Sequence, residues 1–397
     1  MRRALHAAAL ATAILTLTAC DAINKLRGYT PDSITITITG VPNDMTPDVT
    51  ITGPGGYRRE VTETTTLDGL APGAYTVTAA TIAFRDNPLD PDAHTKTLTL
   101  DAGGAQSVQV AYAPHRQYAL AATAHLNQLR AEAGVPPVKL DADNSTPNWL
   151  HARYLVENST WGHEEDPGKP FYTPEGHAAG KRSNIGSPGS GYDFEPYDHP
   201  ENAANTFLTA PFHLFHLLNP SATGTRIAIY RTSTCFAAQD CPNPWTSGAA
   251  AVEMISGRAW PEGKTVRFPE NGQVVPVIRH AGEYPSPVTA CPRYDWPVGL
   301  PILAMHGRGN LPAIKSTRLT RGDEVLEHCT FTAATYTNPD PAAQSLARNL
   351  LDAFGAAIII PREPLAPSST YTVTVEYATH TDTWSFHTAH EDELLFK

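Results

Sequence analysis

Between Trp161 and Pro220 the chain reads His163-Glu164-Glu165-Asp166-Pro167, then Phe171-Tyr172-Thr173-Pro174-Glu175-Gly176, Ser183-Asn184-Ile185-Gly186, Pro211-Phe212-His213 and Leu217-Leu218-Asn219-Pro220. These segments combine histidines, carboxylates and aromatic residues with the turn formers glycine and proline. That mixture predicts a site built from loops and held between helices. The rest of the chain is expected to serve as anchor or β-rich scaffold.

Apolar residues at helical spacing lie on both sides of the first of these segments. One predicted helix ends before Gly134, a second begins near Ser145, and a third begins near Pro200 and is broken at Pro211. Their apolar positions are Tyr118, Ala121, Ala122, Leu126, Leu129 and Ala133, then Trp149, Ala152, Leu155 and Val156, then Ala204, Phe207 and Leu208. After Pro220, residues 226–230 and 249–254 have the composition of strands. Helices followed by strands predict an α+β layer fold for residues 115–260.

The order of several motifs in this region resembles the bacterial branch of the CAP superfamily, which comprises cysteine-rich secretory proteins, antigen 5 and pathogenesis-related-1 proteins. The motifs are Leu126-Asn127-x-x-Arg130, His151-Ala152 on a helix, Gly162-His163, Ser183-Asn184-Ile185, and His213 followed by Leu217-Leu218-Asn219-Pro220. The resemblance implies an α-β-α sandwich whose groove holds two histidines and two glutamates. His163 matches the first histidine of the family and His213 the second.

The acidic half of the family pattern is missing from this sequence. Ser183 stands where family members usually have a glutamate, and residues 207–210, before the second histidine, contain no acid. Glu164, Glu165 and Glu175 lie nearby in sequence and could compensate in part.

The chemistry of the two histidines leaves three alternatives open. They form a groove pair with a binding or structural use, they are ordinary hydrogen-bonded histidines, or they are catalytic. Two imidazoles can bind a divalent metal such as zinc or calcium, although firm zinc sites have three or four protein ligands. Ser183 would be a nucleophile only with a histidine within hydrogen-bond reach. The chain has neither a Gly-x-Ser-x-Gly nor a His-Glu-x-x-His motif.

The sequences on both sides of the central region alternate apolar and polar residues, as β-strands do. Residues 31–114 predict a small β-sandwich, because residues 34–39 alternate apolar and hydroxyl side chains and further short strands follow between turns. Its Leu70-Ala71-Pro72-Gly73-Ala74-Tyr75-Thr76-Val77 segment is similar to prealbumin-like and carboxypeptidase-regulatory-like modules. Residues 261–397 predict an immunoglobulin-like β-sandwich with one short helix at 342–354. Its six histidines are expected at the surface or at strand ends.

The N-terminus predicts export and lipidation. Arg2 and Arg3 precede an apolar run that ends in Leu17-Thr18-Ala19-Cys20, and this ending resembles the lipobox of bacterial lipoproteins. Residues 1–19 are then a signal peptide, Cys20 carries the lipid, and residues 20–30 form a tether; the alternative is an ordinary cleaved signal. Several acyl chains together would anchor the protein stably. Asp21 would favour the inner membrane in some bacteria.

The other four cysteines predict two disulfides in an exported protein. We expect Cys235–Cys241 and Cys291–Cys329, although four cysteines allow three pairings. The alternative is buried free thiols.

The net charge of −11 excludes nucleic acid as an expected partner. The predicted anchor, the modular layout and the incomplete acid set of the CAP resemblance together predict a membrane-anchored extracytoplasmic CAP-domain lipoprotein without enzymatic activity. It would bind a small apolar molecule, a lipid or a cell-wall component. The alternatives are a metal-dependent hydrolase or protease that uses His163 and His213, and an adhesion or scaffold protein with a vestigial groove.

Overall fold

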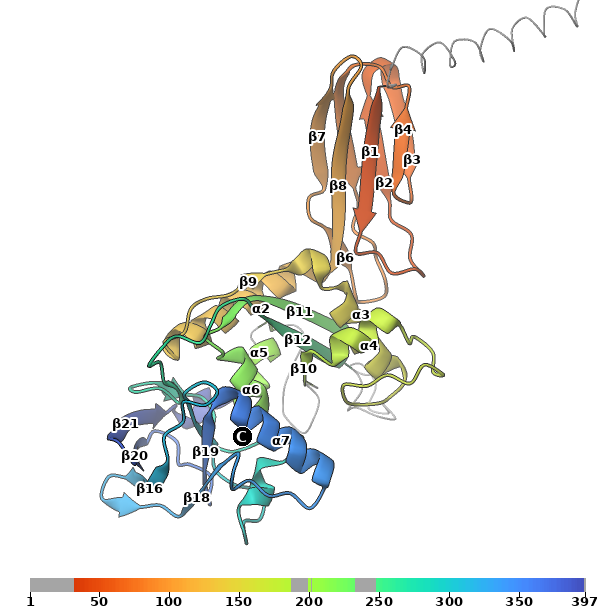
Figure 1. Ribbon diagram of the computed structural model, residues 1–397. Helices are drawn as coiled ribbons and strands as arrows, with labels where there is room; N and C mark the ends of the chain where they lie inside the picture. The colour runs from red at the N-terminus through yellow and green to blue at the C-terminus, as the bar shows by residue number, and fades with distance from the viewer. Residues whose placement is uncertain (1–31, 187–198, 201, 233–247, 396–397) are drawn as a thin grey trace, which may run out of the picture. The chain divides into compact units, whose positions relative to one another are not determined.

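The computed structural model describes residues 32–395, except 187–198, 201 and 233–247. The chain divides into two compact units, Met1–Pro114 and His115–Lys397. In the described residues, helices and several sheets build a multidomain α+β protein with β-rich flanks (Figure 1). The predicted signal peptide, Cys20 and the Cys235–Cys241 pair lie outside the described residues.

In the described part of the first unit, residues 32–114, eight strands form two sheets. The sheet orders are β4-β1-β8-β6 and β3-β2-β5-β7. The strands are β1 (Ser33–Thr39), β2 (Val49–Gly53), β3 (Tyr57–Val61), β4 (Thr65–Asp68), β5 (Gly73–Ala79), β6 (Leu89–Pro91), β7 (Thr95–Leu100) and β8 (Ala105–Pro114). Ile34 and Ile36 on β1 are fully buried because alternate side chains of a strand point to one face. Residues of both sheets share one hydrophobic core.

The second unit begins with helices around a four-stranded sheet of order β10-β12-β11-β9. Its elements are α2 (Arg116–Glu132), β9 (Lys139–Leu140), α3 (Thr146–Glu157), α4 (Pro174–Gly180), β10 (Ser183–Gly186), α5 (Asn202–Asn205), α6 (Pro211–Leu217), β11 (Ala222–Arg231) and β12 (Gly248–Ser256). The first two predicted helices and the two predicted strands are present as α2, α3, β11 and β12, but the third predicted helix is shorter than expected, because α5 ends at Asn205, before Phe207 and Leu208. The segment predicted as loops, however, contains α4 and β10. Thr173 caps α4 by accepting a hydrogen bond from the backbone N–H of Gly176.

The two faces of this sheet have different characters. Ser183 pairs in register with Glu253, so both side chains point to the same face, where Asn148 of α3 hydrogen-bonds to them. The next residue along β12, Val252, points the opposite way. It belongs to the hydrophobic core to which α2, α5 and α6 contribute. The face beneath α3 thus carries a buried polar cluster around Glu253, and the opposite face packs into the hydrophobic core.

The rest of the second unit is β-rich, with two sheets of order β13-β15-β19-β18 and β14-β21-β20-β16-β17. Its elements are β13 (Val266–Phe268), β14 (Val274–Val275), β15 (Ile302–Met305), β16 (Ile314–Arg321), β17 (Glu324–Val325), β18 (His328–Thr332), α7 (Pro341–Phe354), β19 (Ala356–Pro361), β20 (Thr370–Tyr377) and β21 (Thr381–Thr388). The helix predicted at 342–354 is confirmed as α7. It ends at Gly355, which has a positive φ and sits so close to Gly307 that a side chain would overlap that backbone.

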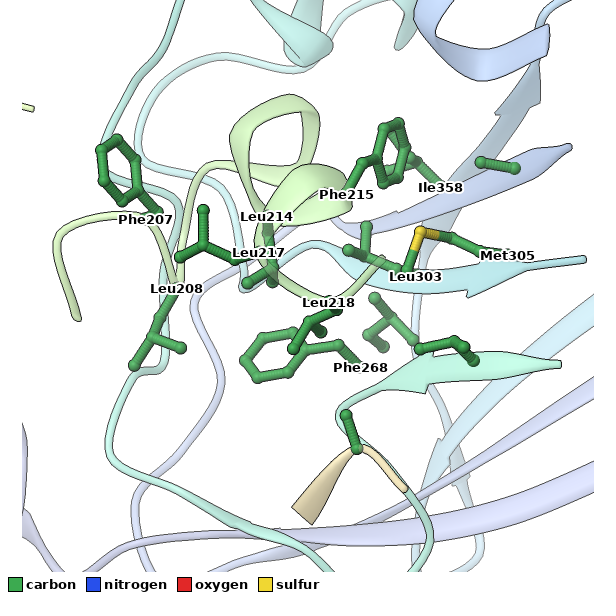
Figure 2. Close-up of a cluster of buried hydrophobic side chains, with 14 of the residues drawn as sticks. Phe207, Leu208, Leu214, Phe215, Leu217, Leu218, Phe268, Leu303, Met305 and Ile358 are labelled. Atoms are coloured by element: carbon green, nitrogen blue, oxygen red, sulfur yellow. The ribbon is translucent and has the colours of Figure 1, made fainter. Parts of the chain in front are cut away.

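The helical and β-rich parts of the second unit share one hydrophobic core. Figure 2 shows Leu214, Phe215 and Leu217 of α6 among side chains of β13, β15 and β19. All three α6 side chains are at most 1% exposed. The position of α6 is therefore determined by both parts of the unit, and His213 lies on this helix.

A loop of the β-rich part, residues 280–300, is fastened at several points. The predicted Cys291–Cys329 disulfide is confirmed, and it joins this loop to β18. The Tyr336 hydroxyl donates to the carbonyl of Ser286 at 2.8 Å. His280 is fully buried and donates from Nδ1 to the carbonyl of Thr209 at 2.6 Å, so its predicted place at the surface or a strand end is wrong. Burial lowers the pKa of His280, which favours the neutral ring.

Candidate functional site

His163 and His213, the two histidines predicted to share a groove, lie side by side. Their ring centroids are 6.4 Å apart and their planes differ by 17°. His163 comes from the connection between α3 and α4 and is exposed, whereas His213 lies on α6 and is partly buried. Phe207 also stacks on His213, with ring centroids 5.4 Å apart, so two nearly parallel aromatic rings neighbour His213.

His213 is held by a carboxylate that the sequence did not indicate. Its Nδ1 lies 2.9 Å from Oε2 of Glu283, and the backbone N–H of Phe212 lies 3.1 Å from the same oxygen. With the Glu283 oxygen as acceptor, Nδ1 of His213 would be the donor of this hydrogen bond and would carry the proton. In the neutral ring, Nε2 then has the free lone pair.

His163 is oriented in the same way by a different acceptor. Its Nδ1 donates to the carbonyl oxygen of Gly180 at 2.9 Å. Desolvation lowers the pKa of His163. The hydrogen bond to the Gly180 carbonyl opposes this shift, and the charges of His213 and His151 add to it. The neutral form therefore dominates near pH 7 and leaves Nε2 free.

Two of the three glutamates expected near the pair, Glu164 and Glu165, are engaged elsewhere. Oε1 of Glu165 accepts from Nδ1 of His151 at 2.8 Å, and both side chains are fully buried. Glu164 is 73% exposed and lies 3.2 Å from Nζ of Lys181. In the described part of the chain, neither carboxylate hydrogen-bonds to His163 or His213.

The His151–Glu165 pair holds the backbone segment that carries His163. Nε2 of His151 lies 3.0 Å from the carbonyl of Gly162, so this ring joins α3 to the segment that carries His163. Gly180 at the end of α4 packs against the ring so closely that a β-carbon there would overlap it. The same Gly180 provides the carbonyl that orients His163. A buried pair thus fixes the backbone around the exposed histidine.

Among the described residues, Ser183 hydrogen-bonds to no histidine. Its hydroxyl donates to the carbonyl of Ala179 at 2.8 Å and accepts from Asn148 at 2.9 Å. The carboxylate beside it is Glu253, which also binds Arg182 and Arg226. Burial opposes ionisation of Glu253, but hydrogen bonds from Arg182 and Asn148 and the charges of Arg182 and Arg226 lower its pKa.

The residues at the pair fit a divalent metal only in part. Two imidazole Nε2 atoms are available, and no group of three or more potential ligands occurs among the described residues. Imidazole suits zinc, whereas calcium takes six to eight oxygen ligands. His163 and His213 would thus hold zinc with solvent or a ligand completing its coordination, and the set does not suit calcium.

A comparison with protein families matches the region that contains both histidines. The model of the CAP cysteine-rich secretory protein family matches residues 123–245. No curated protein matches the chain. Glu283 lies beyond the matched segment. The predicted resemblance is confirmed: the chain carries a CAP superfamily domain, whose family match spans residues 123–245.

Proposed function

We propose that the protein is a non-enzymatic, extracytoplasmic binding module whose ligand occupies the surface around His163 and His213. The observation that carries this is the orientation of the pair: each Nδ1 is committed to a protein acceptor, and neither Nε2 hydrogen-bonds to a described residue, which leaves both for a ligand. A CAP domain is consistent with an extracellular, non-enzymatic module. The same proposal assigns an α-β-α sandwich to the CAP domain, and a small β-sandwich and an immunoglobulin-like sandwich to its flanks.

The ligand that fits this proposal is a small apolar molecule, a lipid or a cell-wall component. Flat ring faces favour apolar and stacking contacts. Trp161, two residues before His163, is 50% exposed and adds an aromatic surface to this segment. The free Nε2 atoms add either hydrogen bonding or a zinc ion.

Membrane attachment through lipidated Cys20 belongs to this proposal. Within the described residues, no helix has the length and apolar character needed to cross a membrane. Replacing Cys20 with Ala is expected to move the protein from the membrane fraction to the soluble fraction and to abolish labelling with palmitate. Unchanged fractionation would refute the anchor.

A zinc titration by calorimetry tests the site. We expect the purified full-length protein to bind zinc with micromolar affinity, and His163→Ala/His213→Ala to lose that binding. His390→Ala is the matched control, because its side chain is 69% exposed and lies far along the sequence from the pair. If zinc affinity falls only in the control, or if the double variant keeps its zinc affinity, zinc binds elsewhere on the protein. If the folded wild-type protein binds no zinc, the ligand of the His163–His213 pair is one that binds without a metal.

A second candidate function is a metal-dependent hydrolase, and one observation favours it. A histidine whose Nδ1 is held by a buried carboxylate is the arrangement of an oriented general base, and His213 with Glu283 has it. Turnover of a peptide or ester substrate that disappears with His213→Ala would establish this alternative. Turnover unaffected by either histidine exchange would exclude it.

A further inference from the structure

We propose that Glu283, which lies outside the matched CAP segment, is the positioning residue of the His163–His213 site. It is inferred to fix the tautomer and the ring orientation of His213 and so to make the β-rich part of the second unit a functional component of the site. This inference deepens the proposed function and rests on it for the ligand. The assignment of the His213 tautomer does not depend on the proposed function.

The first argument is the environment of the carboxylate. The side chain of Glu283 is 1% exposed, and no lysine or arginine in the described part of the chain pairs with it. Three N–H groups satisfy it instead: the backbone N–H groups of Phe212 and His213, and Nδ1–H of His213. A buried carboxylate without a cation is costly unless its hydrogen bonds are complete. Two of these groups are backbone N–H donors, so the carboxyl oxygens of Glu283 act as acceptors at the start of α6.

The second argument is what this contact does to His213. A proton held on Nδ1 leaves Nε2, the other ring nitrogen, as the lone-pair atom. Hydrogen bonds to the remote nitrogen of a ligating histidine fix its tautomer and raise its basicity. Stacking on Phe207 restricts rotation of the same ring. Glu283 and Phe207 together leave His213 with one orientation and one available nitrogen.

The third argument is that contacts of the neighbouring residues fix the backbone position of Glu283. Three residues before it, the backbone N–H of His280 donates to Val298 at 3.1 Å and the ring binds Thr209. Three residues after it, the carbonyl of Ser286 is held by Tyr336. The disulfide follows at Cys291. With α6 packed in the common core (Figure 2), donor and acceptor approach each other on fixed backbones.

A purely structural role would also account for two of the three hydrogen bonds. Glu283 could serve only to accept the free N–H groups at the start of α6, a capping role. Capping would affect stability but would not determine which nitrogen of His213 is protonated. The tautomer is therefore the measurement that separates the two roles.

The test uses full-length protein with ¹⁵N-labelled histidine, and long-range ¹H–¹⁵N correlation spectra recorded at pH 8. The His213 signal is assigned by its absence in His213→Gln. Wild-type His213 is expected as the Nδ1–H tautomer, and Glu283→Ala is expected to shift it toward Nε2–H. Glu283→Gln keeps an acceptor oxygen and should retain Nδ1–H. Glu363→Ala, which removes a carboxylate 81% exposed in the same part of the chain, is the control and should change nothing.

Zinc affinity provides the second readout. Glu283→Ala should weaken binding about 10- to 100-fold, the usual effect of losing such a partner, and Glu283→Gln should weaken it less. If Glu283→Ala does not fold, Glu283→Asp replaces it, because a side chain one methylene shorter withdraws the acceptor while keeping the charge. His213 remaining Nδ1–H in a folded Glu283→Ala or Glu283→Asp protein would overturn the proposal. If wild type binds no zinc, the zinc test of the proposed function fails, but the tautomer still decides the role of Glu283.

Discussion

Two histidine–glutamate pairs in the second unit have similar distances but different environments. His151 and Glu165 are both fully buried, and both ring nitrogens of His151 face acceptors. His213 donates to a buried Glu283, but its own side chain remains 16% exposed, and Nδ1 is the one ring nitrogen that hydrogen-bonds within the part of the chain that the structure describes. The first pair joins backbone segments and has nothing left for a ligand. The second has the free nitrogen that a binding site needs.

The largest expected effect comes from breaking the buried pair. His151→Ala should lower the free energy of unfolding by about 3–5 kcal/mol, because it leaves the Glu165 carboxylate buried without its partner. Urea unfolding followed by tryptophan fluorescence measures this. His163→Ala is the comparison, since an exposed histidine with one hydrogen bond should cost about 1 kcal/mol or less. Equal losses in the two variants would remove the distinction between the pairs.

A third histidine, His216, extends the comparison, because no carboxylate among the described residues pairs with it. Burial, with smaller effects from His213 and His163, lowers its pKa from 6.5 to about 4. Between these values the unfolded chain binds more protons than the folded one. His216 is neutral in both states above pH 6.5, and stability falls as the pH drops from 6.5 to 4, by about 3 kcal/mol.

Replacing His216 with Gln should therefore flatten the acid side of the stability profile. The free energy of unfolding is measured at half-unit steps from pH 7.5 to pH 4. His306, whose pKa burial also lowers to about 4, should account for a separate part of the slope. A profile for His216→Gln that parallels that of wild type would contradict the assignment.

Gly180→Ala should have a smaller effect and test the support beneath His163. The added methyl group would overlap the His151 ring, and such overpacking costs about 1–3 kcal/mol. Because Gly180 also orients His163, zinc binding should weaken as well. Gly168→Ala is the control, since only a side-chain oxygen of Asp166 lies near that position. Full stability and full zinc affinity in Gly180→Ala would show that the backbone can adjust there.

The smallest effect is expected at Ser183. Ser183→Ala removes two hydrogen bonds on the polar face of the sheet, for a loss of about 1–2 kcal/mol. Zinc affinity and any turnover should stay at wild-type values, because the hydroxyl contacts Asn148 and Ala179 and no histidine. Loss of turnover in a folded variant would restore Ser183 as a nucleophile.

The sequence predicted those parts of the site that depend on local pattern. Apolar spacing located α2 and α3, and motif order paired His163 with His213. The helix α4 also had a local signal, Thr173 followed by Pro174, which indicates a capped helix start and was interpreted as a turn.

Glu283 and Glu165 could not be assigned in this way. Glu283 lies 70 residues from His213, and their contact arises from tertiary packing that leaves no periodic trace in a single sequence. Glu165 is close to His163 in sequence, yet it turns inward because His151 lies beneath it. Proximity along the chain therefore suggested the wrong carboxylate.

The core that α6 shares with the β-rich sheet also limits how this gene can be rearranged. A recombination event that moved only the segment matched by the family would carry Phe215 and Leu217 without Leu303 and Ile358, which cover them. The transplanted protein would expose a large apolar patch, the kind of surface that promotes aggregation. The two parts of the second unit are therefore expected to be inherited together.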